Sequence, residues 1–315
     1  MSSTASIRQA TSAEVRRAIS GRTRSAGEVT FSLALFLTLV IALTVLVVLL
    51  FNVARTAIPV ISDQGGRLFQ NGYSSLPERA GLKQGIVGSL YLMVFVLVLA
   101  VPLGIGAAIY MEEYARDSRV TRFINANIRN LAGVPAIVYG ILGLALFVEL
   151  LKPVTGPGSV EGQSLLAGAL TISLMVLPII IITTQEALRS VPRSIREGGF
   201  GVGATRWEVV RSHVLPNAAP GILTGSVLSM ARALGETAPL IMVGAVTGFL
   251  SSGGGIFASL QQRFTSMPTL IFAYTKKPQP EFQDIAAAAI LVLMGLILVV
   301  NLGAILLRNR YERTW

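Results

Sequence analysis

The chain has 315 residues, of which 52% are hydrophobic and only 13% are charged, and its mean hydropathy is +0.67. Soluble domains carry about 25% charged residues, so this composition indicates a membrane protein. The chain has no cysteine and a single histidine, His213, which excludes disulfides, thiolate metal sites and histidine-rich metal clusters. The formal net charge is +10, and its meaning depends on where the basic residues stand.

Apolar stretches long enough to cross a bilayer, which takes about 20 residues, recur along the sequence. They predict an all-α integral membrane protein with spans at about 29–53, 84–110, 128–151, 165–186, 219–248 and 285–307. The first span begins too late for a cleaved signal peptide and is expected to stay as an anchor. The domain prediction is a flexible basic tail over 1–28, a transmembrane domain over 29–310 and a short cytoplasmic end over 311–315.

The basic residues are unevenly distributed between the two sides of the predicted membrane domain. Seventeen of the 26 Lys and Arg residues stand in the tail, in the loops 116–129 and 187–218, or from Arg308 onward. Eight stand in the alternate loops, and Arg232 alone lies inside a span. The positive-inside rule therefore predicts that both termini are cytoplasmic. The net charge follows from topology, so a nucleic-acid partner is not expected.

The fifth predicted span contains the segment MARALGETAPL (230–240), in which Arg232 and Glu236 stand one helical turn apart. An arginine at the centre of a membrane helix costs about 2.5–3.5 kcal/mol, so it should face the protein interior or water. Small residues recur every four positions and predict a close-packed seam beside the pair: Gly221, Gly225, Ser229, Ala233 and Thr237. Gly235 and Pro239 should loosen the helix locally.

Two interpretations of this pair stay open at the level of sequence. It is either a structural ion pair that fixes helix register, or a site on a transport path. A guanidinium presents a planar fork of donors that fits an oxyanion. A carboxylate beside it accepts a hydrogen bond from hydrogen phosphate, whereas sulfate has no proton to donate at neutral pH.

The loop 187–218 predicts a helical hairpin on the cytoplasmic face. Pro192 can begin a first helix, and Gly201 and Gly203 should end it. The segment ATRWEVVRSHVL should form a second helix that Pro216 ends. Four arginines of the hairpin could pair with an acidic groove on a partner: Arg193, Arg196, Arg206 and Arg211. Outside the loop, the adjacent Glu112 and Glu113 are expected to be solvated charges at the end of the second span.

The hairpin resembles the EAA coupling motif of ABC importer permeases. The matching residues are Glu197-Gly198-Gly199, Gly203 six residues after the glutamate, and Leu215-Pro216 at the close, with Gly-Gly standing where the family has Ala-Ala. Four further segments resemble the phosphate importer permeases, and the PstA type more than the PstC type: PLGIGAAIYMEEYA (102–115), LAGVPAIVYGILGL (131–144), ARALGETAPL (231–240) and PEFQDIAAAAILVLM (280–294).

This resemblance implies the six-transmembrane-helix fold of a type I ABC importer permease in a bacterial inner membrane, with a cytoplasmic coupling hairpin. It implies that Arg232 and Glu236 act in phosphate translocation, with another oxyanion or small solute as the alternative. ATPase coupling is implied for Glu197, Gly198, Gly199, Gly203, Leu215 and Pro216. The implied partners are a PstC-type permease, two PstB-type ATPases that bind ATP, and a PstS-type extracytoplasmic phosphate-binding protein.

Other function classes fit the sequence less well. The chain has no G-x-x-x-x-G-K-[ST] nucleotide loop, so we expect no cofactor in it and ATP hydrolysis only in a partner subunit. A single histidine excludes the H-E-x-x-H metalloprotease motif, and an enzyme is not expected. A passive channel or scaffold would have no need of a hairpin that docks an ATPase.

Overall fold

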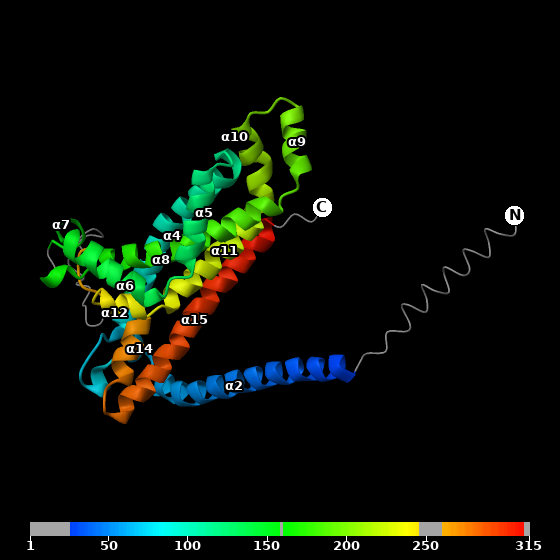
Figure 1. Ribbon diagram of the computed structural model, residues 1–315. Helices are drawn as coiled ribbons and strands as arrows, with labels where there is room; N and C mark the ends of the chain where they lie inside the picture. The colour runs from blue at the N-terminus through cyan, green and yellow to red at the C-terminus, as the bar shows by residue number, and fades with distance from the viewer. Residues whose placement is uncertain (1–25, 158–159, 246–259, 312–315) are drawn as a thin grey trace. The chain divides into compact units, whose positions relative to one another are not determined.

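The computed structural model describes residues 26–157, 160–245 and 260–311 (Figure 1). The chain divides into two units at Asn52 and Val53, and each is described by itself. The first unit is described from Ala26 onward as the leading part of helix α2 (Ala26–Gln64), whose apolar side chains are exposed, as suits a helix in lipid. Most of the predicted tail and of the predicted C-terminal end lies outside the described residues.

The described part of the second unit is helical, with short connections. In chain order, after the end of α2, the elements are α3 (Gly66–Gln70), η1 (Pro77–Arg79), α4 (Lys83–Ile109), the π-helical η2 (Tyr110–Tyr114), α5 (Arg119–Ala132), α6 (Ala136–Gly143), the π-helical η3 (Leu144–Leu150), α7 (Lys152–Thr155), η4 (Val160–Gly162), α8 (Leu165–Ser190), α9 (Arg193–Gly201), α10 (Arg206–Val209), the π-helical η5 (Val210–Val214), α11 (Leu215–Gly235), α12 (Ala238–Met242), α14 (Met267–Thr275) and α15 (Pro280–Tyr311). Among the described residues, five helices are long and apolar enough to cross a membrane, or six if the bent pair α5 and α6–η3 counts as one span.

Helix α8 is the centre of the second unit. Its N-cap is Ser164, whose hydroxyl accepts a hydrogen bond from the Ala167 amide at 3.1 Å. Helices α4 and α11 pack on it along most of its length, so nearly all of its faces are buried. On α4, a Cβ at Gly104 would stand 2.6 Å from Ile180, and this close approach explains why a glycine occupies that position.

The segment predicted as the third span, 128–151, is bent. Helix α5 ends at Ala132, and α6–η3 leaves it at an angle of 101°. Pro135 forms the N-cap of α6, and a proline disfavours helical backbone in the residue before it, which explains the break. The run from Ala136 to Leu150 has a length of about 22 Å at 1.5 Å per residue, shorter than the hydrocarbon core of about 30 Å.

Helix α14 packs at the start of α4, where a Cβ at Gly85 would stand 2.8 Å from Leu270. Helix α14 is largely buried, and the residues 249–259 of the loop before it lie outside the described residues. Beside it, the Lys277 ammonium lies 3.9 Å from the centre of the Phe282 ring and donates to the Ser74 carbonyl at 2.7 Å. Burial lowers the pKa of Lys277.

Within the second unit, the start and the end of α4 mark two opposite ends of the bundle. Helix α14 lies at the first end, and the hairpin of α9 and α10 lies at the second (Figure 1). The orientation predicted from the basic residues would place the hairpin end in the cytoplasm.

Candidate translocation site and coupling hairpin

Arg232 and Glu236 meet at the point where helix α11 stops. The Arg232 Nε donates to Glu236 Oε1 at 3.2 Å. Helix α11 ends at Gly235, Glu236 has extended backbone (φ −77°, ψ 124°), and α12 begins at Ala238. The predicted loosening at Gly235 is therefore a complete break, and the described part of the predicted span 219–248 is two helices with the ion pair at their junction.

The predicted small-residue seam of α11 is confirmed where it meets α8. Gly225, Ser229 and Ala233 are buried. A Cβ at Gly225 would stand 2.3 Å from Thr183 Oγ1, and one at Gly221 would stand 2.8 Å from the Ala187 Cβ. The two helices approach this closely only because the side chains are missing, and their contact fixes the rotation of α11.

Helix α6 supports the break on its far side. A Cβ at Gly140 would stand 2.7 Å from the Cα of Pro239, so α6 and α12 are in backbone contact immediately after Glu236. Pro239 is buried there. The helix end that carries the ion pair is thus held between a tight α8 contact before it and a tight α6 contact after it.

The Arg232 side chain lies on a stripe of α11 that the described helices leave open. Thr224 and Leu228, which precede Arg232 at four-residue spacing, are exposed as well. Arg232 keeps 44% of its side chain accessible and Glu236 keeps 21%. Because a guanidinium is unfavourable in lipid, this stripe fits a second chain or an aqueous path better than it fits hydrocarbon.

The predicted hairpin is present with the predicted turn. Helix α9 follows Pro192, which is its N-cap, and ends at Gly201; Gly203 then has a φ of +83°, a conformation that favours glycine. The second helix starts with a capping box: the Thr205 amide donates to Glu208 Oε2 at 2.7 Å, and the Glu208 amide donates to Thr205 Oγ1 at 3.4 Å. The Thr205 amide and the Thr205 hydroxyl both donate to Glu208 Oε2 at 2.7 Å, and these two hydrogen bonds lower the pKa of Glu208.

The prediction that Pro216 ends the second helix is wrong. The helical run from Arg206 continues through η5 into α11 and reaches Gly235. The turn before the proline is π-helical, and the Leu215 amide donates to the Val210 carbonyl five residues back. The hydrogen-bond register of the helix already changes at this π-helical turn. Pro216, which has no N–H to donate, is therefore tolerated near the start of α11.

The hairpin exposes four of the six residues predicted to couple to a partner, namely Glu197, Gly198, Gly203 and Pro216. Glu197 and Gly198 are exposed, and a Cβ at Gly198 or Gly203 would meet no atom within 4 Å. Gly199 instead packs inward on Val209. Large apolar side chains are exposed around them: Phe200, Val202 and Trp207. Of the two closing residues, Leu215 is partly buried and Pro216 is exposed.

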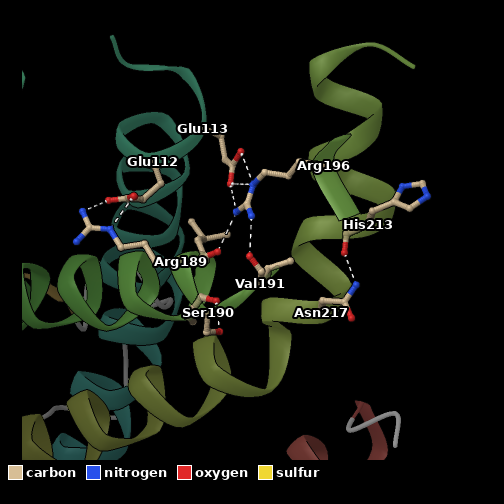
Figure 2. Close-up of polar contacts among 10 residues, drawn as sticks. Glu112, Glu113, Arg189, Ser190, Val191, Arg196, His213 and Asn217 are labelled. Carbon is tan, nitrogen blue, oxygen red and sulfur yellow. Dashed lines mark hydrogen bonds and ion pairs between the residues drawn. The ribbon is translucent and has the colours of Figure 1, made fainter. Parts of the chain in front are cut away.

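Sequence reasoning missed a set of contacts that ties the hairpin to the rest of the bundle (Figure 2). Three consecutive residues of η2, here called the EEY turn (Glu112, Glu113 and Tyr114), each meet an arginine. Glu112 accepts two hydrogen bonds from Arg189, at the end of α8. Glu113 accepts from Arg196 of α9, at 2.6 Å from Nη2. The Arg206 guanidinium lies 5.7 Å from the centre of the Tyr114 ring.

Arg196 is engaged on two sides. Besides Glu113, it donates from Nη1 to the Val191 carbonyl at 2.8 Å and from Nη2 to the Leu188 carbonyl at 2.9 Å, and so satisfies carbonyls at the end of α8. Its side chain is 20% accessible and that of Glu113 is 9%. The expectation that both glutamates are solvated charges, and that Arg196 serves a partner, is wrong.

One sequence signal could have revealed these contacts. Two carboxylates close one apolar span, and Arg189 and Arg196 stand where the fourth span ends and the hairpin begins. His213 takes no part in the contacts of the EEY turn: its side chain is exposed and points away from the turn, and its backbone carbonyl accepts a hydrogen bond from the Asn217 side chain (Figure 2). Among the described residues, His, Asp and Glu form no cluster that could hold a metal.

A bundle of apolar helices with a broken helix, a partly accessible ion pair at the break and a hairpin with an exposed face is the architecture of a membrane transport permease. Residues 100–313 match the family of binding-protein-dependent transport system inner membrane components. The chain belongs to this family. Its members are membrane components of transport systems that also include a binding protein.

The relatives are named as permease proteins. The chain is 34% identical to the phosphate transport system permease protein PstA of Yersinia pestis over 71% of each chain. It is 35% identical to PstA 1 of Mycobacterium tuberculosis over 74% of this chain and 73% of that one. It is 34% identical to the probable ABC transporter permease protein YqgI of Bacillus subtilis, where the match spans 55% of this chain and 56% of that protein.

Solved structures share the fold at low identity. A bacterial alginate ABC transporter chain aligns with a TM-score of 0.63 at 16% identity and covers 92% of this chain and 99% of its own. A chain of the MetNI methionine ABC transporter aligns with a TM-score of 0.54 at 14% identity, over 74% of this chain and 95% of that one. These transporters handle different solutes, so the shared fold does not by itself indicate a solute.

Proposed function

We propose that this chain is a PstA-type permease subunit of an ATP-driven importer of inorganic phosphate, and that Arg232 and Glu236 lie on the translocation path. The observation that carries the proposal is the partly accessible Arg232–Glu236 pair at the α11 break, on a stripe that the described helices leave open. The names of the PstA relatives support phosphate as the solute.

The chemistry of the pair suits hydrogen phosphate. The guanidinium can donate two parallel hydrogen bonds to an oxyanion while its charge compensates the charge of the ion. Glu236 can accept a hydrogen bond from the protonated oxygen of hydrogen phosphate, and it repels an anion that has no proton to donate. The ion pair then serves as the resting state: each side chain satisfies the other until an anion enters between them.

The exposed face of the hairpin supports a docked ATPase. On this face Glu197 exposes a carboxylate, and Gly198 leaves its backbone accessible. Phe200 and Trp207 expose apolar side chains, which are unfavourable in water. The importer would contain a PstC-type second permease, two PstB-type ATPases and a PstS-type binding protein. The hairpin and both termini would face the cytoplasm.

Phosphate uptake by cells that lack this chain tests the proposal. Wild-type protein should restore uptake of radiolabelled phosphate, and excess sulfate should not compete. Arg232→Gln and Glu236→Gln should each lower the uptake rate at least about tenfold, the scale of losing one charge-assisted hydrogen bond. Arg122→Gln, which removes a cation from an exposed ion pair on α5, is the matched control and should transport normally.

Each remaining outcome of the uptake assay contradicts part of the proposal. If Arg232→Gln and Glu236→Gln both take up phosphate at the wild-type rate, the pair is only structural. Restored uptake of another oxyanion in place of phosphate would make the chain a permease of the same family with a different solute.

Docking is tested separately by copurification. Glu197→Arg should reduce the amount of ATPase subunit that copurifies with the chain, because it reverses the one carboxylate exposed on α9. Arg122→Gln should copurify the ATPase as the wild type does. Full recovery of the ATPase with Glu197→Arg would remove this residue from the docking surface.

A further inference from the structure

The hairpin is joined to the bundle in two different ways. The peptide chain connects α9 directly to α8 and connects α10 through η5 to α11. Helix α4 has no such covalent connection to the hairpin. Its end is held there by the EEY turn and by apolar packing of Ala108 in the same cluster as Val209 and Val214.

The EEY turn contacts three helices besides α4. Glu113 reaches α9 through Arg196, Tyr114 reaches α10 through Arg206, and Glu112 reaches the end of α8 through Arg189. The two glutamate pairs are partly buried, with 9% and 14% of the carboxylate side chains accessible. Three neighbouring residues thus engage both hairpin helices and α8, which a single flexible surface pair would not do.

Helix α4 extends from this link to the neighbourhood of the ion pair. Its 27 residues give a length of about 40 Å, and it packs along α8. Leu92 and Val96 of α4 line one small cavity together with Ala233 and Leu234 of α11. These two α11 residues follow Arg232 directly, so a shift of α4 along its axis alters the packing beside the candidate path.

We propose that the EEY turn is a positioning device that makes α4 move with the coupling hairpin, so that a movement of the hairpin reaches the α11 break through α4 as well as through the covalent connections. Glu112 and Glu113 act through their arginines and touch no solute. The inference rests on the proposed function in one respect, namely that an ATPase moves the hairpin.

Distances between spin labels test the link without any transported solute. The chain has no cysteine, so Ser194→Cys on α9 and Leu103→Cys on α4, both exposed, can be labelled in the complete importer. With wild-type Glu113, the distance between the labels should be the same in the nucleotide-free and ATP-trapped states. With Glu113→Gln, the distance should change between the states or its distribution should broaden. An unchanged distance in Glu113→Gln overturns the proposal.

The coupling ratio gives a second readout that a purely structural role would not change. In proteoliposomes, Glu113→Gln should lower the phosphate transported per ATP hydrolysed about tenfold, the scale of one lost charge-assisted pair, while the complex still assembles. Arg122→Gln, which breaks an exposed pair unconnected to the hairpin, should keep the wild-type ratio. A wild-type ratio in Glu113→Gln overturns the proposal.

A charge exchange separates the link from a folding defect. Glu112→Arg and Arg189→Glu should each lower the coupling ratio, and the double variant should restore much of it, because the two side chains pair with each other. A double variant that assembles and has wild-type thermal stability but stays uncoupled overturns the proposal. If no variant and not even the wild type transports phosphate, the proposed solute fails, and the label distances still decide the role of the EEY turn.

Discussion

For Arg232, the expectation from membrane energetics can be compared directly with the structure. Its cost in lipid predicts a partner and a polar face, and the structure gives it Glu236 at 3.2 Å and an open stripe. The same reasoning did not predict the ion pair of Glu113, because water can solvate a carboxylate at the end of a span without cost. Its partner, Arg196, is 83 positions away in the sequence.

Gly225 sets the distance between α11 and α8. We expect Gly225→Ala to lower the stability of the purified chain by about 1–3 kcal/mol, because the new Cβ would stand 2.3 Å from Thr183 Oγ1 and force the helices apart. Thermal unfolding in detergent should show a lower Tm. Gly106→Ala on α4 is the control: a Cβ there meets nothing within 4 Å, so the Tm should be unchanged or slightly higher. Equal Tm values for both variants would argue against a tight seam.

At the scale of elements, the boundaries that the sequence predicts are those with local chemical causes. Gly203 has a positive φ in the turn that follows the first hairpin helix, and Thr205 with Glu208 starts the second helix by a local capping box. Pro216 shows the opposite case. Its usual effect is overridden because the preceding π-helical turn changes the hydrogen-bond register before the proline is reached.

The capping box makes the start of α10 depend on pH. The folded pKa of Glu208 is lowered by its hydrogen bonds with Thr205, so its stabilising contribution is present above the unfolded pKa and is lost as pH falls through the folded pKa. We expect hydrogen-exchange protection of residues 206–214, corrected for intrinsic rates, to fall when the pH drops from 7 to below 4.5. Thr205→Ala should lower protection about fivefold at pH 7, from the loss of about 1 kcal/mol of capping, and should weaken the pH dependence.

Ser194→Ala, on the exposed side of α9, is the control for the capping box and should keep the wild-type pH dependence. Protection that stays constant across this pH range in the wild type would contradict a role for the ionised Glu208.

At the scale of the whole molecule, orientation in the membrane follows from the distribution of charge and is still a prediction. The absence of cysteine makes a direct test possible. A membrane-impermeant maleimide should label Ser75→Cys in intact cells and leave Ser194→Cys unlabelled, and after lysis it should label both, because both positions are exposed. The reverse pattern would invert the topology and place the hairpin outside the cell.

The sequence by itself determined the class of this protein, its apolar spans, the hairpin with its glycine turn, and the position of the ion pair. These features follow from the transfer of each segment into lipid and from local backbone chemistry, which neighbouring residues are enough to specify. Only the tertiary structure decided that the break of α11 at the ion pair is complete, and that the EEY turn holds the hairpin against the end of α4. Such features depend on which distant segments the folded chain brings together, and a hydropathy pattern contains no information on the partner of a charge many residues away.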